Sequence, residues 1–191
     1  MGEIAANGLP MVEEDEAAGA VAAIYEEIKR EMMLPEVPNI FKALAASPAA
    51  LAIEWTMFKA LYEHSTLPQS LSAMIMYAIA EQNDCQYCSA SHELSCRTLG
   101  IDEETLHKLV NDLPNLTPER IRATIQFALK VARSPKSLVR EDYDALRAQG
   151  VSDEELVEII QLAAIASSGD VKADALKIDV DPFVSEGLAV A

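Results

Sequence analysis

Aromatic residues are scarce in this chain of 191 residues: they make up 5% of the sequence, whereas Ala, Leu, Ile and Met are abundant. This composition is typical of helices rather than of a β-sandwich. The chain also lacks the strand-like alternation of apolar and polar residues and any glycine-rich phosphate loop. We therefore predict an all-α protein. With 50% hydrophobic residues, a single domain over residues 1–191 can bury a full core.

Positive charge is also in short supply: 15 Lys and Arg residues stand against 31 Asp and Glu residues, a net charge of −16. No basic stripe is available to neutralise phosphates, so neither nucleic acid nor an anionic membrane surface is an expected partner. No apolar run reaches the roughly 18 residues of a membrane span. The first residues lack the basic and apolar regions of a signal peptide. A cytoplasmic location is expected.

Helix start and stop signals and apolar periodicity divide the chain into short helices. The predicted helices cover approximately residues 17–33, 39–46, 48–64, 66–82, 85–98, 102–112, 118–133, 140–148 and 153–166. Residues 1–14 are expected to form a loose arm. Residues 179–191 lose periodicity and are expected to form a tail that packs on a neighbour or frays.

A weak internal two-fold repeat is visible at an offset of 85 residues. It aligns residues 74–75 and 78–79 with residues 159–160 and 163–164. It also places the first two cysteines opposite Asp170 and Ala173. If the halves share an ancestor, only the first half retains the chemistry.

Cysteine is rare, and three cysteines in a reducing compartment do not make a disulfide framework. Two of them form the pair Cys85-x-x-Cys88, which points to redox or metal chemistry. His92 follows Cys88 by four residues, and Glu81 precedes Cys85 by four. No other segment concentrates so many nucleophilic and acid/base side chains.

The expected helix brings these side chains together. With Asp84 as its N-cap, Cys85 and Cys88 occupy the first turn, where free N–H groups and the helix dipole stabilise a thiolate. Cys85, Cys88 and His92 share one helix face. His92 can accept the thiol proton, and Glu81 can orient the histidine or relay protons. One thiol can then be oxidised to a sulfenic acid and resolved by the other as a disulfide.

Two other interpretations of this segment stay open. The cysteines can be small buried hydrophobic residues in an Ala-rich helix. Zinc can bind Cys85, Cys88, His92 and Cys96, but on one helix these residues span about 16 Å. A tetrahedral site would therefore need a ligand from elsewhere in place of Cys96. Neither a metal nor another cofactor is expected.

The remaining chemically notable residues are expected to be structural or solvent-facing. Cys96 is interpreted as a core residue, and His64 and His107 as solvent-facing or satisfied by neighbours. Trp55 and the methionines at positions 57, 74 and 76 are interpreted as core filling.

The segment Asn83-Asp-Cys85-Gln-Tyr-Cys88-x-x-x-His92 resembles the core motif of AhpD-like alkylhydroperoxidases, within the carboxymuconolactone decarboxylase family. Residues 122–135 and 141–155 are similar to the peroxidase-related branch of that family, and the resemblance extends over roughly residues 48–181.

The resemblance implies an AhpD-like helical bundle that assembles as a homo-oligomer (dimer, trimer or hexamer). It implies a thiol-dependent peroxidase that reduces organic hydroperoxides with electrons from a dithiol donor. By motif position, Cys88 resembles the peroxidatic cysteine, Cys85 the resolving cysteine, and His92 a member of the proton relay.

One position departs from the family pattern. A glutamate twelve residues before the first cysteine is replaced by Ala73, and Glu81 or Glu158 is a candidate to take its role. Two further functions stay open: a non-catalytic AhpD-fold oligomer with a redox-sensing or structural cysteine pair, and a lyase acting on a lactone or carboxylated substrate. The decarboxylases of the family lack the cysteine pair, which argues against the lyase.

Overall fold

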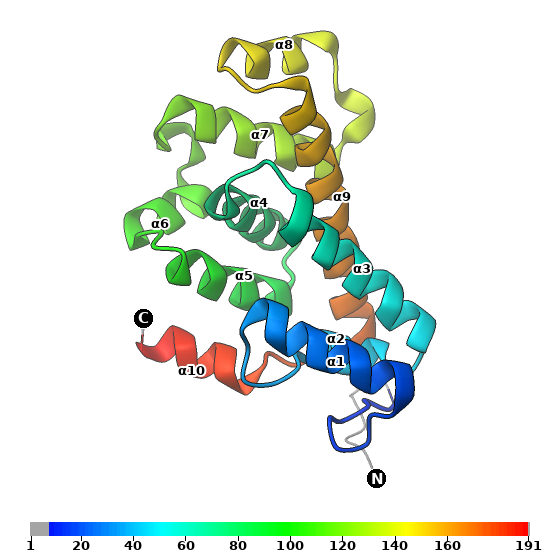
Figure 1. The fold of residues 1–191 in the computed structure, drawn as a ribbon. Helices are drawn as coiled ribbons and strands as arrows, with labels where there is room; N and C mark the ends of the chain where they lie inside the picture. The colour runs from blue at the N-terminus through cyan, green and yellow to red at the C-terminus, as the bar shows by residue number, and fades with distance from the viewer. Residues whose placement is uncertain (1–7, 191) are drawn as a thin grey trace. The chain divides into compact units, whose positions relative to one another are not determined.

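The computed structural model describes residues 8–190, and within this range the chain is helical and contains no strand (Figure 1). This confirms the all-α prediction. The described helices are α1 (Gly19–Met32), α2 (Asn39–Leu44), α3 (Pro48–His64), α4 (Gln69–Gln82), α5 (Gln86–Thr98), α6 (Glu103–Asn111), α7 (Glu119–Arg133), α8 (Arg140–Ala148), α9 (Asp153–Leu176) and α10 (Pro182–Val190), with 3₁₀ turns at Leu113–Asn115 and Pro135–Ser137. No helix in the described part of the chain has the length and apolarity needed to cross a membrane.

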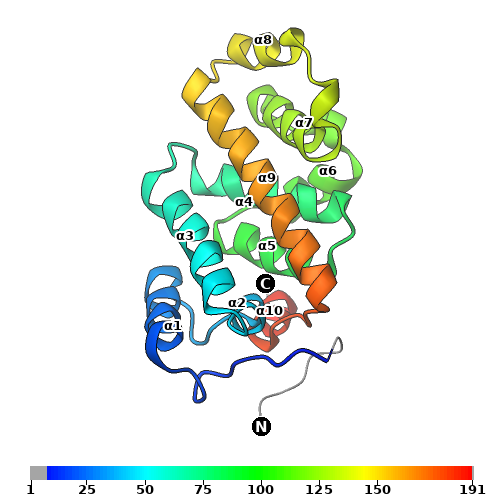
Figure 2. The same cartoon turned by 90° about the vertical axis from the view of Figure 1, so that its right-hand side faces the viewer.

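The chain divides into two compact units, with the boundary inside the long helix α9. The first unit contains residues 1–65 and 172–181, and the second contains residues 66–171 and 182–191. Figure 2 shows α9 running without a break between residues 153 and 176. Each unit has its own packed helices.

In the first unit, α1, α2 and α3 pack around an apolar cluster. Its buried members are Val21, Tyr25, Ile28, Val37, Phe41, Ala45, Leu51 and Trp55. The ring of Phe41 packs edge-on against Trp55, with centroids 6.1 Å apart, and against Phe58, with centroids 5.8 Å apart. Trp55 is therefore a core residue, as predicted, and such edge-to-face pairs stabilise beyond the area they bury.

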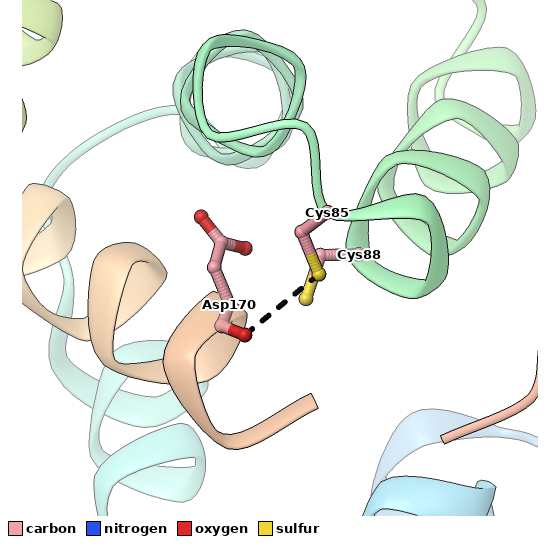
Figure 3. Close-up of side chains that lie close together, drawn as sticks. All are labelled: Cys85, Cys88 and Asp170. Carbon is pink, nitrogen blue, oxygen red and sulfur yellow. Dashed lines mark hydrogen bonds between the residues drawn. The ribbon is translucent and has the colours of Figure 1, made fainter. Parts of the chain in front are cut away.

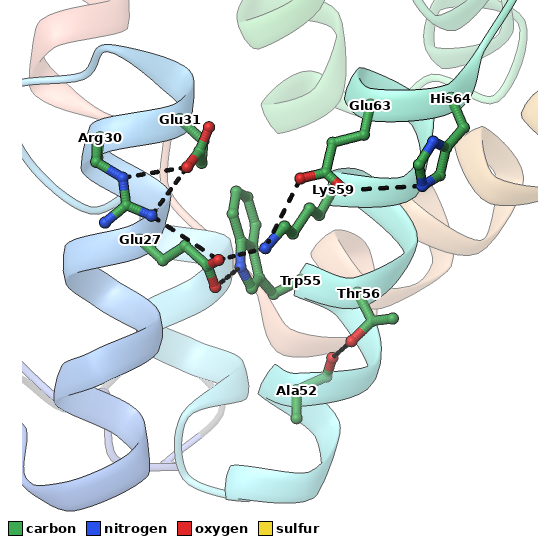
Figure 4. Close-up of polar contacts among 9 residues, drawn as sticks. All are labelled: Glu27, Arg30, Glu31, Ala52, Trp55, Thr56, Lys59, Glu63 and His64. Carbon is green, nitrogen blue, oxygen red and sulfur yellow. Dashed lines mark hydrogen bonds and ion pairs between the residues drawn. The ribbon is translucent and has the colours of Figure 1, made fainter.

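A polar network holds α1 against α3 beside this cluster (Figure 4). The carboxylate of Glu27 on α1 accepts hydrogen bonds from Trp55 Nε1 at 2.7 Å and from Lys59 Nζ at 2.5 Å. These two bonds, that of Lys59 first, hold the pKa of the Glu27 carboxyl below its usual value. The indole N–H of the buried tryptophan thus has the partner that burial requires.

Part of the expected N-terminal arm is bonded to the rest of the first unit. Residues 1–7 lie outside the described residues, but residues 12–14 are bonded to the first unit. The amide of Val12 donates to the carbonyl of Lys42 at 3.1 Å. The carboxylate of Glu14 accepts from the amide of Val37 at 2.8 Å and from Lys29 Nζ at 2.7 Å. The expectation of a loose arm is wrong for residues 12–14, because these long-range bonds fix them.

The helix α9 begins with the predicted capping box. Ser152 and Glu155 exchange hydrogen bonds, with the Ser152 amide donating to Oε2 of Glu155 at 2.7 Å. However, the helix ends at Leu176 rather than near residue 166. The Ser-Ser-Gly at residues 167–169 does not end it, because the face carrying Ala163, Ala166 and Ala173 continues to be buried.

In the second unit, α4 lies at the centre and packs against α5, α6 and α7. Its buried residues are Leu71, Ala73, Met74, Ile75, Tyr77, Ala78, Ile79 and Ala80. A helix that is apolar on almost every side is expected in the middle of a helical layer. The segment that contains Cys85, Cys88 and His92 directly follows the C-terminal end of α4.

The C-terminal tail forms a helix, so the expectation of a non-periodic tail is wrong. Pro182 occupies the first position of α10, which its ring favours, and α10 packs on α5. A Cβ added at Gly187 would come within 2.8 Å of the Leu94 side chain. The glycine that permits this close approach also weakens the helical pattern in the sequence.

The proposed two-fold repeat is not confirmed. Residues 168–169 of α9 align with Asn83 and Asp84, where α4 ends and the chain turns into α5. The second half has an uninterrupted helix at this position, so the break that defines the first half is not reproduced.

Replacing Lys172 tests how much its ion pair with the buried Glu54 stabilises the first unit. Lys172 Nζ pairs with Glu54, whose side chain is 3% exposed. Lys172→Met would leave a buried carboxylate without its partner, and should lower the free energy of unfolding by about 3 kcal/mol. Chemical denaturation measures this.

The matched surface control is Arg30→Met, because the ion pairs of the exposed Arg30 contribute at most about 1 kcal/mol. The double variant Glu54→Leu/Lys172→Met should recover most of the loss. Equal losses for Lys172→Met and Arg30→Met would contradict the structural role of the pair.

Candidate functional site

The functional segment begins with the turn between α4 and α5. Asn83 is the C-cap of α4, and Asp84 follows in the left-handed conformation, with φ at 58°. The amide of Cys85 donates to the carbonyl of Ala80 at 3.1 Å, and the amide of Asp84 donates to the carbonyl of Glu81 at 3.2 Å. This is the Schellman pattern, which satisfies the last carbonyls of a helix.

Cys85, rather than Asp84, is the N-cap of α5. The prediction of Asp84 as N-cap is wrong because this residue is used to end the preceding helix. Asp and Asn tolerate the left-handed conformation better than most residues. The carbonyl of Cys85 accepts the first bond of the new helix, from the amide of Ser89 at 2.9 Å. Only Asp84 therefore lies between the C-cap of α4, Asn83, and the N-cap of α5, Cys85.

The two thiols meet a carboxylate from α9 (Figure 3). The Sγ atoms of Cys85 and Cys88 and a carboxylate oxygen of Asp170 all lie within 4.8 Å of one another. The Cys85 thiol donates to the backbone carbonyl of Asp170, with 3.9 Å between sulfur and oxygen. The amide Nδ2 of Asn83 donates to Oδ2 of Asp170 at 2.7 Å. We call Cys85, Cys88 and Asp170 the thiol–carboxylate cluster.

The cluster is buried, but its two cysteine residues differ slightly in exposure. Cys85 is 0% exposed and Asp170 is 3% exposed, whereas Cys88 retains 7% exposure. Of the two cysteines, Cys88 is therefore the less deeply buried residue.

The cluster raises the pKa of the Cys88 thiol far above its usual value. The hydrogen bond with Cys85 is the largest cause, followed by burial and by the negative charge of Asp170. The expected stabilisation of a thiolate by the helix N-terminus is thus outweighed. Burial and a nearby like charge both disfavour the charged form. Cys88 is therefore held as a neutral thiol, and its ionisation requires a proton acceptor.

His92 lies one turn after Cys88 on α5 and is partly buried. Burial lowers the pKa of its imidazole to about 4, so the ring is neutral at pH 7. Neither the imidazole of His92 nor the carboxylate of Glu81 makes a hydrogen bond or ion pair with another residue of the range 8–190. The structure brings Cys85 and Cys88 together, but records no bond from either of these two predicted partners to the thiols.

Glu158, the other candidate for the missing glutamate, is engaged elsewhere. Its carboxylate accepts from the amide of Thr66 at 2.9 Å and from the amide of Leu67 at 3.3 Å. Along α9 it lies twelve residues before Asp170, a distance of about 18 Å. Glu158 therefore ties the chain before α4 to α9 and does not reach the thiols.

Asp170 is the site residue that sequence reasoning missed. Its signal was a single carboxylate on the apolar face that also carries Ala163, Ala166 and Ala173. This signal is visible only if the helix continues past residue 166. The proposed repeat aligns Asp170 with Cys85, but this alignment predicts no function for Asp170.

The assignments of Cys96, His64 and His107 agree with the structure, whereas of the three methionines interpreted as core filling only Met74 is buried and Met57 and Met76 are partly buried. Cys96 is fully buried, and burial raises the pKa of its thiol to about 12. His64 and His107 are exposed. Among residues 8–190, the one group of at least three His, Cys, Asp or Glu side chains close enough to share a metal ion is the thiol–carboxylate cluster. The zinc set with His92 and Cys96 is therefore not assembled.

No protein-family model and no curated protein matches the sequence. The structure is similar to a peroxidase-related protein with an alkylhydroperoxidase AhpD core from Ralstonia eutropha JMP134, at 24% identity over 96% of each chain, with a TM-score of 0.83. It is also similar to a peroxidase-related protein from Silicibacter sp. TM1040, at 25% identity over 95% of this chain and 94% of that one, with a TM-score of 0.82.

A third similar structure is that of the debrominase Bmp8 in complex with 2,3,4-tribromopyrrole. It shares 18% identity over 97% of this chain and 98% of that one, with a TM-score of 0.80. The chain therefore has the AhpD-like fold. This confirms the resemblance that the cysteine motif indicated.

The left-handed residue before Cys85 allows a test of the turn. Asp84→Gly should leave the free energy of unfolding nearly unchanged, because glycine adopts positive φ freely. Asp84→Val should lower it by about 1–2 kcal/mol. Thermal or chemical unfolding measures both, and equal stabilities of the two variants would argue against the left-handed turn.

The pKa of His92 predicts a pH-dependent stability. In the unfolded chain a histidine titrates near pH 6.5, whereas the folded ring titrates near 4. The unfolded state therefore binds an extra proton as the pH falls from 6.5 to 4, and the folded state loses stability over this window. Relative to His92→Gln, the wild type should become less stable at pH 5 than at pH 7.5. NMR titration of the His92 imidazole provides the direct check.

Proposed function

We propose that this AhpD-fold chain is a thiol-dependent peroxidase that reduces organic hydroperoxides with its Cys85–Cys88 pair. The observation that carries the proposal is the buried cluster in which two thiols and one carboxylate lie within 4.8 Å of one another. Such a cluster holds a nucleophile, a resolving thiol and a proton acceptor at one place. The proposal includes a cytoplasmic location, a dithiol electron donor and assembly as a homo-oligomer.

In the first step, Cys88 attacks the hydroperoxide. Its proton passes to the carboxylate of Asp170, and the sulfur attacks the terminal oxygen of ROOH. The O–O bond breaks, the alcohol ROH leaves with the proton held by Asp170, and Cys88 becomes a sulfenic acid. The greater exposure of Cys88 and the raised pKa of its thiol support this assignment, because a buried neutral thiol needs an adjacent base.

In the second step, the Cys85 thiol attacks the sulfenic sulfur of Cys88. A disulfide forms, and water leaves with the Cys85 proton. A dithiol donor then supplies two electrons and two protons to restore both thiols. The two sulfur atoms lie on the first turn of one helix, so disulfide formation requires side-chain movement rather than rearrangement of helices.

His92 and Glu81 stay in the proposal as proton carriers rather than as partners of the thiols. His92 is neutral at pH 7 and lies one turn beyond Cys88, and is proposed to exchange protons between the cluster and solvent. Glu81 lies in the last turn of α4, next to the Schellman turn. Asp170 is proposed to perform the proton transfer of the family's glutamate, which Ala73 replaces in this chain.

A second substrate class is suggested by the fold similarity to a debrominase. Oxidation of two thiols to a disulfide supplies two electrons, which is the number that replacement of a C–Br bond by C–H requires. The balance is ArBr plus two thiols giving ArH, a disulfide and HBr. The same cluster contains both thiols, and 2,3,4-tribromopyrrole is the probe for this alternative.

Cysteine variants test the proposed peroxidase. Consumption of cumene hydroperoxide with a dithiol donor should fall at least 100-fold in Cys88→Ser, which loses the nucleophile. Cys85→Ser should form a trappable sulfenic acid at Cys88 but not a disulfide. Asp170→Asn should slow the reaction roughly 100-fold, the size of a lost general base.

The matched control is Cys96→Ser, because Cys96 is buried outside the cluster and should be dispensable for turnover. Wild-type rates in both Cys88→Ser and Cys85→Ser would refute the proposal. Thiols that stay unreactive toward hydroperoxide would favour the non-catalytic oligomer. Debromination of the tribromopyrrole without hydroperoxide turnover would indicate that the two thiols reduce brominated aromatic compounds rather than hydroperoxides.

A further inference from the structure

We propose that the reduced thiol–carboxylate cluster of Cys85, Cys88 and Asp170 is also a binding site for one thiophilic divalent metal ion, such as Zn²⁺. Metal binding itself is independent of the proposed peroxidase. Its consequence, a block of thiol oxidation, rests on that proposed function.

The cluster has nearly the dimensions of a metal site. Zinc–sulfur bonds are about 2.3 Å and zinc–oxygen bonds about 2.0 Å, so tetrahedral ligands lie roughly 3.5–3.8 Å apart. The three ligand atoms of the cluster all lie within 4.8 Å of one another. Closure around an ion therefore requires shifts of about 1 Å, which side-chain rotation can supply.

The tertiary structure removes the geometric objection to a metal site in the cysteine motif. Ligands confined to one helix, from Cys85 to Cys96, span too great a distance. The third ligand comes instead from α9, where Asp170 faces both thiols (Figure 3). Two helices that are distant in the sequence thus supply the donor atoms.

A neighbouring side chain orients the carboxylate. The amide Nδ2 of Asn83 donates to Oδ2 of Asp170 at 2.7 Å. This bond holds the carboxylate beside the two thiols. Outer hydrogen bonds of this kind are a regular feature of metal sites and strengthen binding.

The charge balance favours a divalent ion. Binding releases one proton from each thiol to the buffer, and two thiolates, one carboxylate and M²⁺ leave a net charge of −1. The cation replaces two thiol protons next to a buried carboxylate, so it compensates charges that burial otherwise disfavours. Three protein ligands leave the fourth tetrahedral position for water, as in sites that exchange their ligands.

Metal binding and oxidation exclude each other. A disulfide between Cys85 and Cys88 removes both thiolate ligands, so the oxidised chain cannot hold the ion. Conversely, a bound ion occupies the lone pairs with which sulfur attacks a hydroperoxide. The ion should therefore protect the thiols, and their oxidation should release it.

Titration with Co²⁺ under anaerobic conditions tests the site, using the full reduced chain. One equivalent should bind and produce thiolate-to-cobalt charge-transfer absorption, and Zn²⁺ should displace it. Cys85→Ser and Cys88→Ser should each weaken binding at least 100-fold and reduce this absorption. Asp170→Asn should weaken binding about 10- to 100-fold and leave the thiolate absorption in place, and Asn83→Ala should weaken it about 10-fold.

The matched control is Cys96→Ser, which should bind like the wild type, and the disulfide form should not bind. Unchanged affinity in the two cysteine variants, or in Asp170→Asn, would overturn the proposed site. The two proposals can be distinguished by their outcomes. Cobalt absorption without hydroperoxide turnover would contradict the proposed peroxidase and support the metal site. Turnover with no cobalt absorption refutes the site alone.

Discussion

The left-handed turn at Asp84 is the constraint on which the candidate site depends. The backbone bonds from Cys85 to Ala80 and from Asp84 to Glu81 end α4 in a single turn. Since Cys85 completes this turn and also caps α5, its side chain has little freedom of position. Cys88 follows on the first turn of the same helix. The buried centre of α4 thus anchors both thiols through the backbone.

The position of Asp170 decides the chemistry of these thiols. A helix N-terminus alone would stabilise a thiolate, but burial and a neighbouring carboxylate act against it. The result is a protonated thiol beside a carboxylate, which the proposed mechanism uses as nucleophile and proton acceptor. This arrangement also makes the cluster a set of metal ligands once the protons leave. The proposed redox chemistry and the proposed metal binding therefore use the same three side chains.

The similar structures show that proteins with this fold can have different activities. Peroxidase-related proteins and a debrominase share this fold with the chain at 18–25% identity. One architecture can support several reactions when a few side chains at one place supply the chemistry. For this chain, the geometry of the cluster, rather than the overall fold, is the basis of the proposed peroxidase and of the proposed metal site.

The sequence by itself determined the helical class, most helix positions and the choice of Cys85 and Cys88 as candidate site residues, because periodicity, caps and motif spacing are local signals. The range Pro48–His64 and the range Arg140–Ala148 match the predicted helices. Local signals misplaced the N-cap at Asp84, since an aspartate favours both a cap and a left-handed turn. They also ended α9 too early at its Ser-Ser-Gly and missed α10. The carboxylate beside the thiols was decided only by the tertiary structure, because Asp170 meets Cys85 across 85 residues of chain and no local pattern encodes that contact.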